Sequence, residues 1–97
     1  YVSPFEIVAS LATHPDVLEA AVIGAEDENQ LIKPKAYVVL KDTYTGSPEL
    51  EVELKNFVKD KIAPYKYPRW IEFVPELPKT ATGKIQRFKL RQRASAG

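Results

Sequence analysis

Residues with the potential for chemistry are concentrated in one polar segment near the C-terminal end, Leu77–Arg87, which reads LPKTATGKIQR. A glycine beside a lysine in such a loop can bring backbone N–H groups and an ammonium group to a phosphate. The segment is not a Walker loop, because that pattern requires G-x-x-x-x-G-K-[ST], whereas here only Gly83 is present and Ile85 follows the lysine. By residue type alone, the segment is either a phosphate-binding loop or an ordinary surface loop, and surface loops are commoner.

Other polar side chains that could do chemistry also have simpler structural explanations. Lys79 is either a second phosphate ligand or a solvated loop charge. Thr80 and Thr82 either contact a ligand or hydrogen-bond the backbone of their own loop, which is the commoner use of threonine. His14 precedes a proline at the end of a predicted helix, which favours a structural role over catalysis. Glu6 follows a serine by three residues and is expected to cap a helix rather than to act as a general base.

Length and composition exclude several classes of protein. A chain of 97 residues can form one domain with a modest core, but not a large enzyme with its own deep cleft. The absence of cysteine excludes disulfide scaffolds and thiol nucleophiles, and a single histidine cannot build a multi-histidine metal site, so no metal site is expected. No apolar run approaches the roughly 18 residues of a membrane helix. The start at Tyr1, without an initiator methionine, indicates a segment of a longer protein.

Charge is distributed unevenly along the chain. Residues 1–60 carry eleven acidic and five basic side chains, a net charge of −6, whereas residues 61–97 carry nine basic and two acidic ones, a net charge of +7. A basic end on a near-neutral domain indicates an anionic partner, such as a phosphate, a nucleotide, a nucleic acid or an acidic protein surface. Nucleic acid is disfavoured, because no aromatic stacking platform accompanies the basic side chains of the predicted terminal helix. These side chains belong to Arg87, Lys89, Arg91 and Arg93.

Two amphipathic helices are predicted, and each begins with a serine followed by a proline. Ser3 suits the N-cap of the first helix, which is expected to end before Pro15. Ser47 suits the N-cap of the second, which is expected to end at Ala63-Pro64. The apolar face of the first helix would consist of Phe5, Val8, Leu11 and Ala12. That of the second would consist of Leu50, Leu54, Phe57, Val58 and Ile62.

Three strands and a short terminal helix complete the predicted elements. Residues 17–25 read VLEAAVIGA with only partial alternation, which favours a strand buried on much of both faces. Residues 35–41 are expected to pair with it as a hairpin or as a neighbour, and residues 70–74 form a third strand with Trp70 in the core. Residues 87–93 suit a short helix. This order predicts an α+β fold, a small sheet of about three strands covered by two to three helices.

The loop also carries a family resemblance. The pattern P-K-T-x-x-G-K-x-x-R resembles the C-terminal signature of the adenylate-forming superfamily, which includes acyl- and aryl-CoA synthetases, adenylation domains of peptide synthetases, and luciferases. Segments 1–7, 14–22 and 63–68 are also similar to this family, so the resemblance covers practically the whole chain. VSPFEI, NQLIKPKAYVVLK and APYKYPRWIEFV most resemble benzoate-CoA ligases and similar aryl-CoA ligases. The signature residues are Pro78, Lys79, Thr80, Gly83, Lys84 and Arg87.

The resemblance implies that residues 1–97 are the small, mobile C-terminal domain of a cytoplasmic ligase whose N-terminal domain is its first partner. In such enzymes ATP and a carboxylic acid give an acyl-adenylate, and CoA then displaces AMP to give a thioester. ATP and CoA are therefore expected as substrates, and Mg²⁺ is expected to accompany ATP without being bound by this domain. The alternative is a stand-alone α+β module for RNA or an acidic partner, which would need aromatic and basic side chains interleaved on a sheet face.

The resemblance also assigns residue roles. Lys84 would act in adenylate formation, with Lys79, Thr80 and Gly83 in the nucleotide or phosphate loop. An ammonium there would offset the charge that develops when a carboxylate attacks the α-phosphate, so the lysine would stabilise charge rather than act as a base. The same residue is a candidate acylation target, with a lysine acyltransferase or deacylase as a candidate partner.

A second group of residues would serve the CoA step. The resemblance points to Lys66, Tyr67 and Arg69, with Tyr65 as a packing neighbour. Tyr67 stands where relatives carry a basic residue, so stacking or hydrogen bonding is expected there instead of an ion pair with a CoA phosphate.

Overall fold

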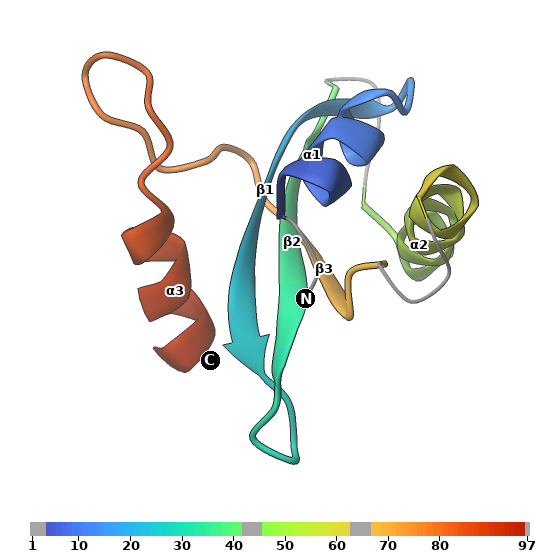
Figure 1. Cartoon of the computed structure of the whole chain (residues 1–97). Coiled ribbons are helices and arrows are strands. Elements are labelled where there is room, and N and C mark those ends of the chain that lie inside the picture. Colours follow the sequence, from blue (N-terminus) through green and yellow to red (C-terminus); the bar gives the residue numbers. More distant parts are fainter. Residues whose placement is uncertain (1–3, 42–45, 63–66, 97) are drawn as a thin grey trace.

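A computed structural model describes residues 4–41, 46–62 and 67–96 of the chain. A three-stranded sheet and three helices confirm the predicted α+β class (Figure 1). The strand order is β1-β2-β3, in which β1 and β2 pair antiparallel and β2 and β3 pair parallel. The elements are α1 (Pro4–Ala12), β1 (Val17–Glu26), β2 (Ile32–Leu40), α2 (Pro48–Lys61), β3 (Trp70–Phe73) and α3 (Arg87–Ala96).

Helices cover both faces of the sheet, with α1 and α2 on one side and α3 on the other (Figure 1). The sheet therefore separates two apolar clusters, which explains why the sequence of β1 lacks a clean alternation. The first cluster contains Ile7, Leu11, Val17, Ala20, Val22, Ala36, Val38, Leu54, Val58 and Ile71. The second contains Ala21, Ile23, Tyr37, Val39, Val74, Leu77 and Leu90.

A β-bulge near the start of β1 changes which side chains face each cluster. Successive pairs join Val17 to Leu40 and Glu19 to Val39, so Leu18 has no partner on β2. The extra residue reverses the alternation of faces, because two residues of β1 then stand opposite one of β2. Val17 consequently packs in the first cluster, and Glu19 lies on the other side of the sheet, the side that α3 covers.

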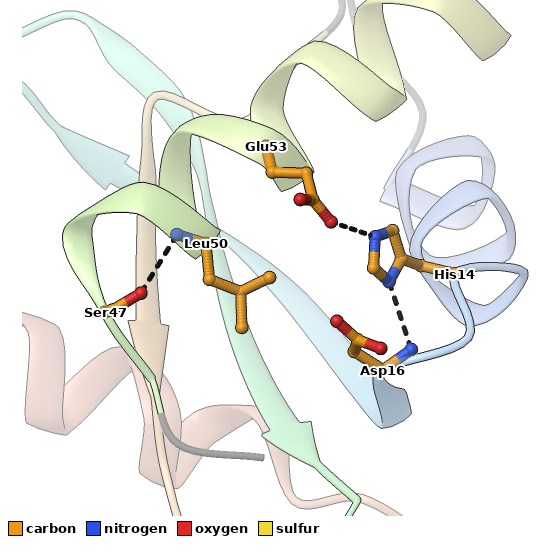
Figure 2. Close-up of polar contacts among 5 residues, drawn as sticks. All are labelled: His14, Asp16, Ser47, Leu50 and Glu53. Atoms are coloured by element: carbon orange, nitrogen blue, oxygen red, sulfur yellow. Dashed lines mark hydrogen bonds and ion pairs between the residues drawn. The ribbon is translucent and has the colours of Figure 1, made fainter.

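Helix α2 follows its predicted pattern. The Ser47 hydroxyl oxygen accepts a hydrogen bond from the Leu50 N–H at 3.1 Å, which caps the helix (Figure 2). Leu54 and Val58 are fully buried against the sheet, which confirms the predicted stripe. The last helical residue is Lys61, and the Ala63-Pro64 stop expected from the sequence lies outside the described residues.

Helix α1 buries only part of the predicted face: Leu11 is buried as predicted, whereas Ala12 is exposed. Ile7 and Leu11 are fully buried, whereas Phe5 is 73% exposed, so the prediction that Phe5 begins the apolar face is wrong. The helix packs on β1 through the row that begins at Ile7, a residue that the periodicity left out. Ser3, the predicted N-cap, lies outside the described residues.

The connection between β1 and β2 is a hairpin, as one of the two sequence alternatives expected, with a loop of residues 27–31. The Asp27 carboxylate accepts hydrogen bonds from the N–H groups of Leu31 at 3.0 Å and Asn29 at 2.8 Å. These donors hold the pKa of the Asp27 carboxyl below its ordinary value. Gln30 turns the chain with a φ of 63°. Because this turn closes within five residues, β2 begins at Ile32 rather than at Lys35.

Glu72 on β3 joins α3 to the sheet. Its carboxylate accepts from the Arg93 guanidinium at 2.7 Å and lies 3.2 Å from the Lys35 ammonium. Partial burial acts to raise the pKa of Glu72, but the hydrogen bonds from Arg93 and Lys35 outweigh it and hold the pKa below its ordinary value. Because the folded-state pKa is depressed, the stabilisation is present above the unfolded pKa and is lost as pH falls through the folded value.

Replacing Glu72 with glutamine should therefore lower the free energy of unfolding of the domain at neutral pH. The free energy of unfolding should also fall less steeply as the pH is lowered. We expect a loss of about 0.5–1 kcal/mol near pH 7, because the pair is partly screened by solvent, and almost none near pH 3. Urea unfolding at both pH values measures this difference. Glu76→Gln is the control, because this exposed acid lies four residues along the chain and forms no ion pair within the described residues. Equal losses at both pH values would contradict the assignment.

Candidate functional site

The segment that carries Lys84 forms a short β-hairpin between β3 and α3. Lys79 and Ile85 form an antiparallel bridge at its base, and the Thr80 N–H donates to the Lys84 carbonyl oxygen at 2.8 Å. We call residues 78–86 the lysine hairpin. It projects away from the sheet and its helices (Figure 1). The tip is thus displayed outside the body of the domain.

Gly83 allows the lysine hairpin to reverse direction. Its N–H donates to the Thr80 carbonyl oxygen at 2.9 Å, which closes a four-residue turn, and its φ is +88°. A turn followed by a residue in the left-handed region is a common hairpin connection, and glycine adopts that conformation without strain. An added Cβ would meet nothing within 4 Å. The backbone conformation, rather than lack of space, therefore favours glycine directly before Lys84.

Two threonine hydroxyls brace the same turn. The Thr80 hydroxyl oxygen accepts a hydrogen bond from the Lys84 N–H at 3.1 Å, and it lies 3.0 Å from the Thr82 hydroxyl. Thr80 thus has the backbone-bonding role that the sequence favoured, and Thr82 contacts the Thr80 hydroxyl. The backbone of Lys84 is consequently held by Thr80 on both its N–H and its carbonyl.

The two lysines of the lysine hairpin differ in their surroundings. The Lys84 side chain is exposed, and within the part of the chain that the structure describes no carboxylate lies within ion-pair distance of its ammonium. The Lys79 ammonium, in contrast, lies 2.8 Å from a carboxylate oxygen of Glu19 on β1. Lys79 is therefore a partly exposed charge that is paired with Glu19, whereas Lys84 is available to an external anion.

Arg69 directly precedes β3 and lies near the β1–β2 hairpin. Its N–H donates to the Pro34 carbonyl oxygen at 2.8 Å, and its guanidinium lies 3.3 Å from the Glu28 carboxylate. Both charged side chains are largely exposed. The β1–β2 turn and the lysine hairpin lie at opposite ends of the sheet (Figure 1). The structure thus places Arg69 and Lys84 at different ends of the domain.

The other residues assigned to the CoA step are less accessible or not described. The Tyr67 ring is half-buried against the first cluster, and the Lys59 ammonium lies 4.2 Å from its centre, a cation–π contact. Lys66 and Tyr65 lie outside the described residues. Trp70 is half-buried and belongs to neither apolar cluster, so its predicted core position is wrong. Trp70 instead lies beside the Arg69 guanidinium, 5.8 Å from the ring centre.

His14 occupies a hydrogen-bonded corner that sequence reasoning did not find. Only 6% of the residue is exposed, its Nε2 lies 2.7 Å from the Glu53 carboxylate, and its Nδ1 accepts from the Asp16 N–H at 3.1 Å (Figure 2). Its ring also meets the edge of Phe57 at 4.9 Å. The bonds join the α1–β1 corner to α2, which agrees with a structural role. The sequence His14-Pro15-Asp16 at the end of the first helix was the only sign in the sequence that a hydrogen-bonded corner could form here.

Ligand atoms of His14, Asp16 and Glu53 lie within 4.8 Å of one another, a spacing that could hold a metal ion. However, Nδ1 accepts a backbone hydrogen bond, so the ring proton resides on Nε2 and is donated to Glu53. A neutral imidazole that bound a metal through Nε2 would need that proton on Nδ1, where it would face the Asp16 N–H. The hydrogen bonds therefore favour a structural corner over a metal site.

None of the helices in the described ranges is long and apolar enough to cross a membrane.

Comparisons with known proteins agree on one family. Residues 6–84 match the AMP-binding enzyme C-terminal domain. The chain is 65% identical over 91 residues to a benzoate–CoA ligase of Thauera aromatica, covering 94% of this chain and 17% of that protein. It is 53% identical over 98 residues to a 4-hydroxybenzoate–CoA/benzoate–CoA ligase of Rhodopseudomonas palustris, covering 100% and 18%. A solved benzoate CoA ligase from Burkholderia xenovorans matches with a TM-score of 0.87 and 60% identity, covering 94% and 18%. The chain thus spans less than a fifth of the length of these relatives.

Proposed function

The chain belongs to the family of AMP-binding enzyme C-terminal domains, and from this we propose that it serves as the mobile C-terminal domain of an ATP-dependent carboxylate–CoA ligase. The whole enzyme would join a carboxylic acid to AMP and then transfer the acyl group to CoA. Benzoate or a related aryl acid is the proposed substrate class. The observation that carries this proposal is the 65% identity to a benzoate–CoA ligase over 94% of the chain.

In the first half-reaction, Lys84 would supply its ammonium to the reacting α-phosphate. Attack of a carboxylate on this phosphate brings two anions together, and negative charge develops on the nonbridging oxygens and on the departing pyrophosphate. An exposed ammonium on a braced turn can meet that charge with little reorganisation. ATP would bring Mg²⁺ to the N-terminal domain rather than to this one.

In the second half-reaction, the opposite end of the domain would face the active site. Arg69 lies near the β1–β2 turn, away from the lysine hairpin, so one domain can present a different basic group after a rotation. This arrangement supports alternation of two faces between the two steps. Lys66 and Tyr67 are proposed to take part in the same CoA contact.

The experiment that tests this proposal is an assay of the full-length enzyme for AMP release with CoA and a panel of aromatic and aliphatic acids. We expect release with benzoate-like acids and no turnover by residues 1–97 alone. Turnover by these residues without the N-terminal domain, or no AMP release with any carboxylic acid, would overturn it.

Arg69→Ala in the full-length enzyme should raise the KM for CoA more than the KM for ATP. The expected loss is about 1–2 kcal/mol, the usual range for a charge-assisted hydrogen bond to a phosphate near the surface. Steady-state kinetics with each substrate varied in turn measure the difference. Glu28→Gln serves as the control, because it removes the carboxylate beside Arg69 and leaves the guanidinium in place. An unchanged CoA dependence in the alanine variant would restrict Arg69 to a structural role.

The alternative RNA-binding module is disfavoured by the covering of both sheet faces. RNA-binding sheets stack bases on exposed aromatic rings, whereas the central Tyr37 is fully buried beneath α3 in the described structure. A cytoplasmic location and the acylation of Lys84 by a dedicated acyltransferase, with a deacylase to reverse it, remain proposals for the full-length protein. The exposed ammonium on the lysine hairpin is the feature that supports the acylation proposal.

A further inference from the structure

We propose that Glu19 is a positioning residue for adenylate formation, because through Lys79 it fixes the base of the lysine hairpin that carries Lys84. The inference rests on the function proposed above for Lys84 and adds a residue of β1 to it. Glu19 would not touch the substrate. It would act by holding the ammonium of Lys84 where the reacting phosphate arrives.

The contact joins segments that are 60 residues apart in the sequence. The Lys79 ammonium donates to a carboxylate oxygen of Glu19 at 2.8 Å, and the backbone of Lys79 forms the bridge with Ile85 that closes the hairpin. Lys79 therefore ties both strands of the lysine hairpin to β1. Ile85, which packs against the second apolar cluster, is the other anchor at this base.

The Glu19 carboxylate depends on Lys79 more than an ordinary surface acid would. Its second oxygen, Oε1, is buried and has no hydrogen-bond partner. A carboxylate that has lost water on one oxygen is costly unless a cation compensates its charge. The 2.8 Å contact with Lys79 supplies that compensation. Separating the two side chains should therefore cost more free energy than separating a fully solvated ion pair.

The β-bulge at Leu18 is what directs Glu19 toward the hairpin. In an unbroken strand, Glu19 would share a face with Val17 and would point into the apolar cluster beneath α1 and α2. The extra residue turns Glu19 to the opposite face, where Lys79 reaches it. Bulges commonly re-aim a side chain next to a functional site. Here the bulge accounts for an acid directly before residues 20–23, which are buried on both faces of the sheet.

Position matters because the ammonium of Lys84 has to meet a developing charge at short range. A displacement of about 1 Å in a reacting geometry can reduce a rate by up to about 10²-fold. Without the Glu19 anchor, the lysine hairpin would keep its own turn, which is closed by Thr80 and Gly83, but would lose one of its two attachments at the base. The effect should therefore be confined to the step that uses Lys84.

The test uses single-turnover kinetics of the full-length enzyme, with adenylate formation and thioester formation from a preformed acyl-adenylate measured separately. Glu19→Gln and Lys79→Met should each slow adenylate formation about 10-fold, well inside the limit for a misplaced group, and should change thioester formation less than about twofold. The exchanged pair, Glu19→Lys with Lys79→Glu, should recover at least about a third of the lost rate by restoring the ion pair with its partners reversed. Amide hydrogen exchange in residues 79–86 of Glu19→Gln should also rise.

Glu51→Gln is the matched control, because its ion pair with Lys55 on α2 is similarly exposed and does not involve the lysine hairpin.

Equal slowing of both half-reactions by Glu19→Gln would indicate a purely structural role and would overturn the inference. An unchanged adenylation rate would also overturn it, and a faster one would overturn it by indicating that Glu19 withholds Lys79 from the phosphate. The inference would also be overturned if the exchanged pair, Glu19→Lys with Lys79→Glu, recovered none of the lost rate of adenylate formation. If the wild type forms no adenylate from any acid, the proposed function itself fails. If Lys84→Ala slows adenylate formation but Glu19→Gln and Lys79→Met do not, only this inference fails.

Discussion

Replacing Lys84 with alanine in the full-length protein should slow adenylate formation at least ~10²-fold if it is the ligase proposed above, which corresponds to roughly 3 kcal/mol of barrier height. The physical reason is that, in the proposed role, Lys84 supplies one preorganised cation to a phosphate where negative charge develops. Lys84 lies on a turn whose backbone is held by Thr80, and its ammonium is exposed. Single-turnover formation of the acyl-adenylate measures the effect directly.

Two comparisons make this prediction specific. Thioester formation from a preformed acyl-adenylate should be much less affected, because we propose that a different face of the domain serves that step. Lys84→Arg should not restore the full rate, because a planar guanidinium does not replace a compact ammonium. Lys89→Ala removes an exposed charge from α3 and is the control for the general loss of a positive charge. Equal damage to both half-reactions would remove the assignment of Lys84 to adenylation.

Leu54→Ala should be the most destabilising single truncation on α2. The Leu54 side chain is fully buried in the first apolar cluster, between α2 and the sheet. Removing its methyl groups forfeits apolar burial and leaves a cavity, at an expected cost of about 2–5 kcal/mol in the free energy of unfolding. Because small domains are stable by only about 5–15 kcal/mol, this single change should leave the isolated domain close to its unfolding transition. Urea unfolding of the domain measures the loss.

Val52→Ala on the same helix is the matched control. Val52 is 57% exposed, so its truncation leaves no cavity, and its effect should stay within about 0.5 kcal/mol. A comparable loss in the two variants would contradict the packing explanation, because alanine is the best helix former and a lower helix propensity could not account for either loss.

Much of this domain was predictable from short stretches of sequence. The serine and proline before α2 predicted its start, because capping is satisfied within one turn of the chain. The stripe that contains Leu54 and Val58 predicted the buried face, because side chains three and four residues apart share one side of a helix. Gly83 beside Lys84 in a polar segment predicted a surface loop, and the structure has an exposed hairpin there.

The predictions that failed depended on neighbours that periodicity does not describe. Phe5 fits the helical spacing but is exposed, because α1 meets β1 through the row of Ile7 and Leu11. Trp70 has a large apolar ring and lies in an apolar strand, as a core residue would, yet it is half-buried beside Arg69. In both cases the packing of one element on another selected the buried side.

The sequence by itself therefore determined the class of the fold and the extents of its elements to within a few residues. These properties depend on caps, turns and repeats that act over one or two turns of chain. Only the tertiary structure decided that Lys79 is held by Glu19, 60 residues away, and that His14 joins α1 to α2 through Glu53. A one-residue bulge in β1 reverses which side chains share a face, and the resulting contacts form only after distant segments have packed together.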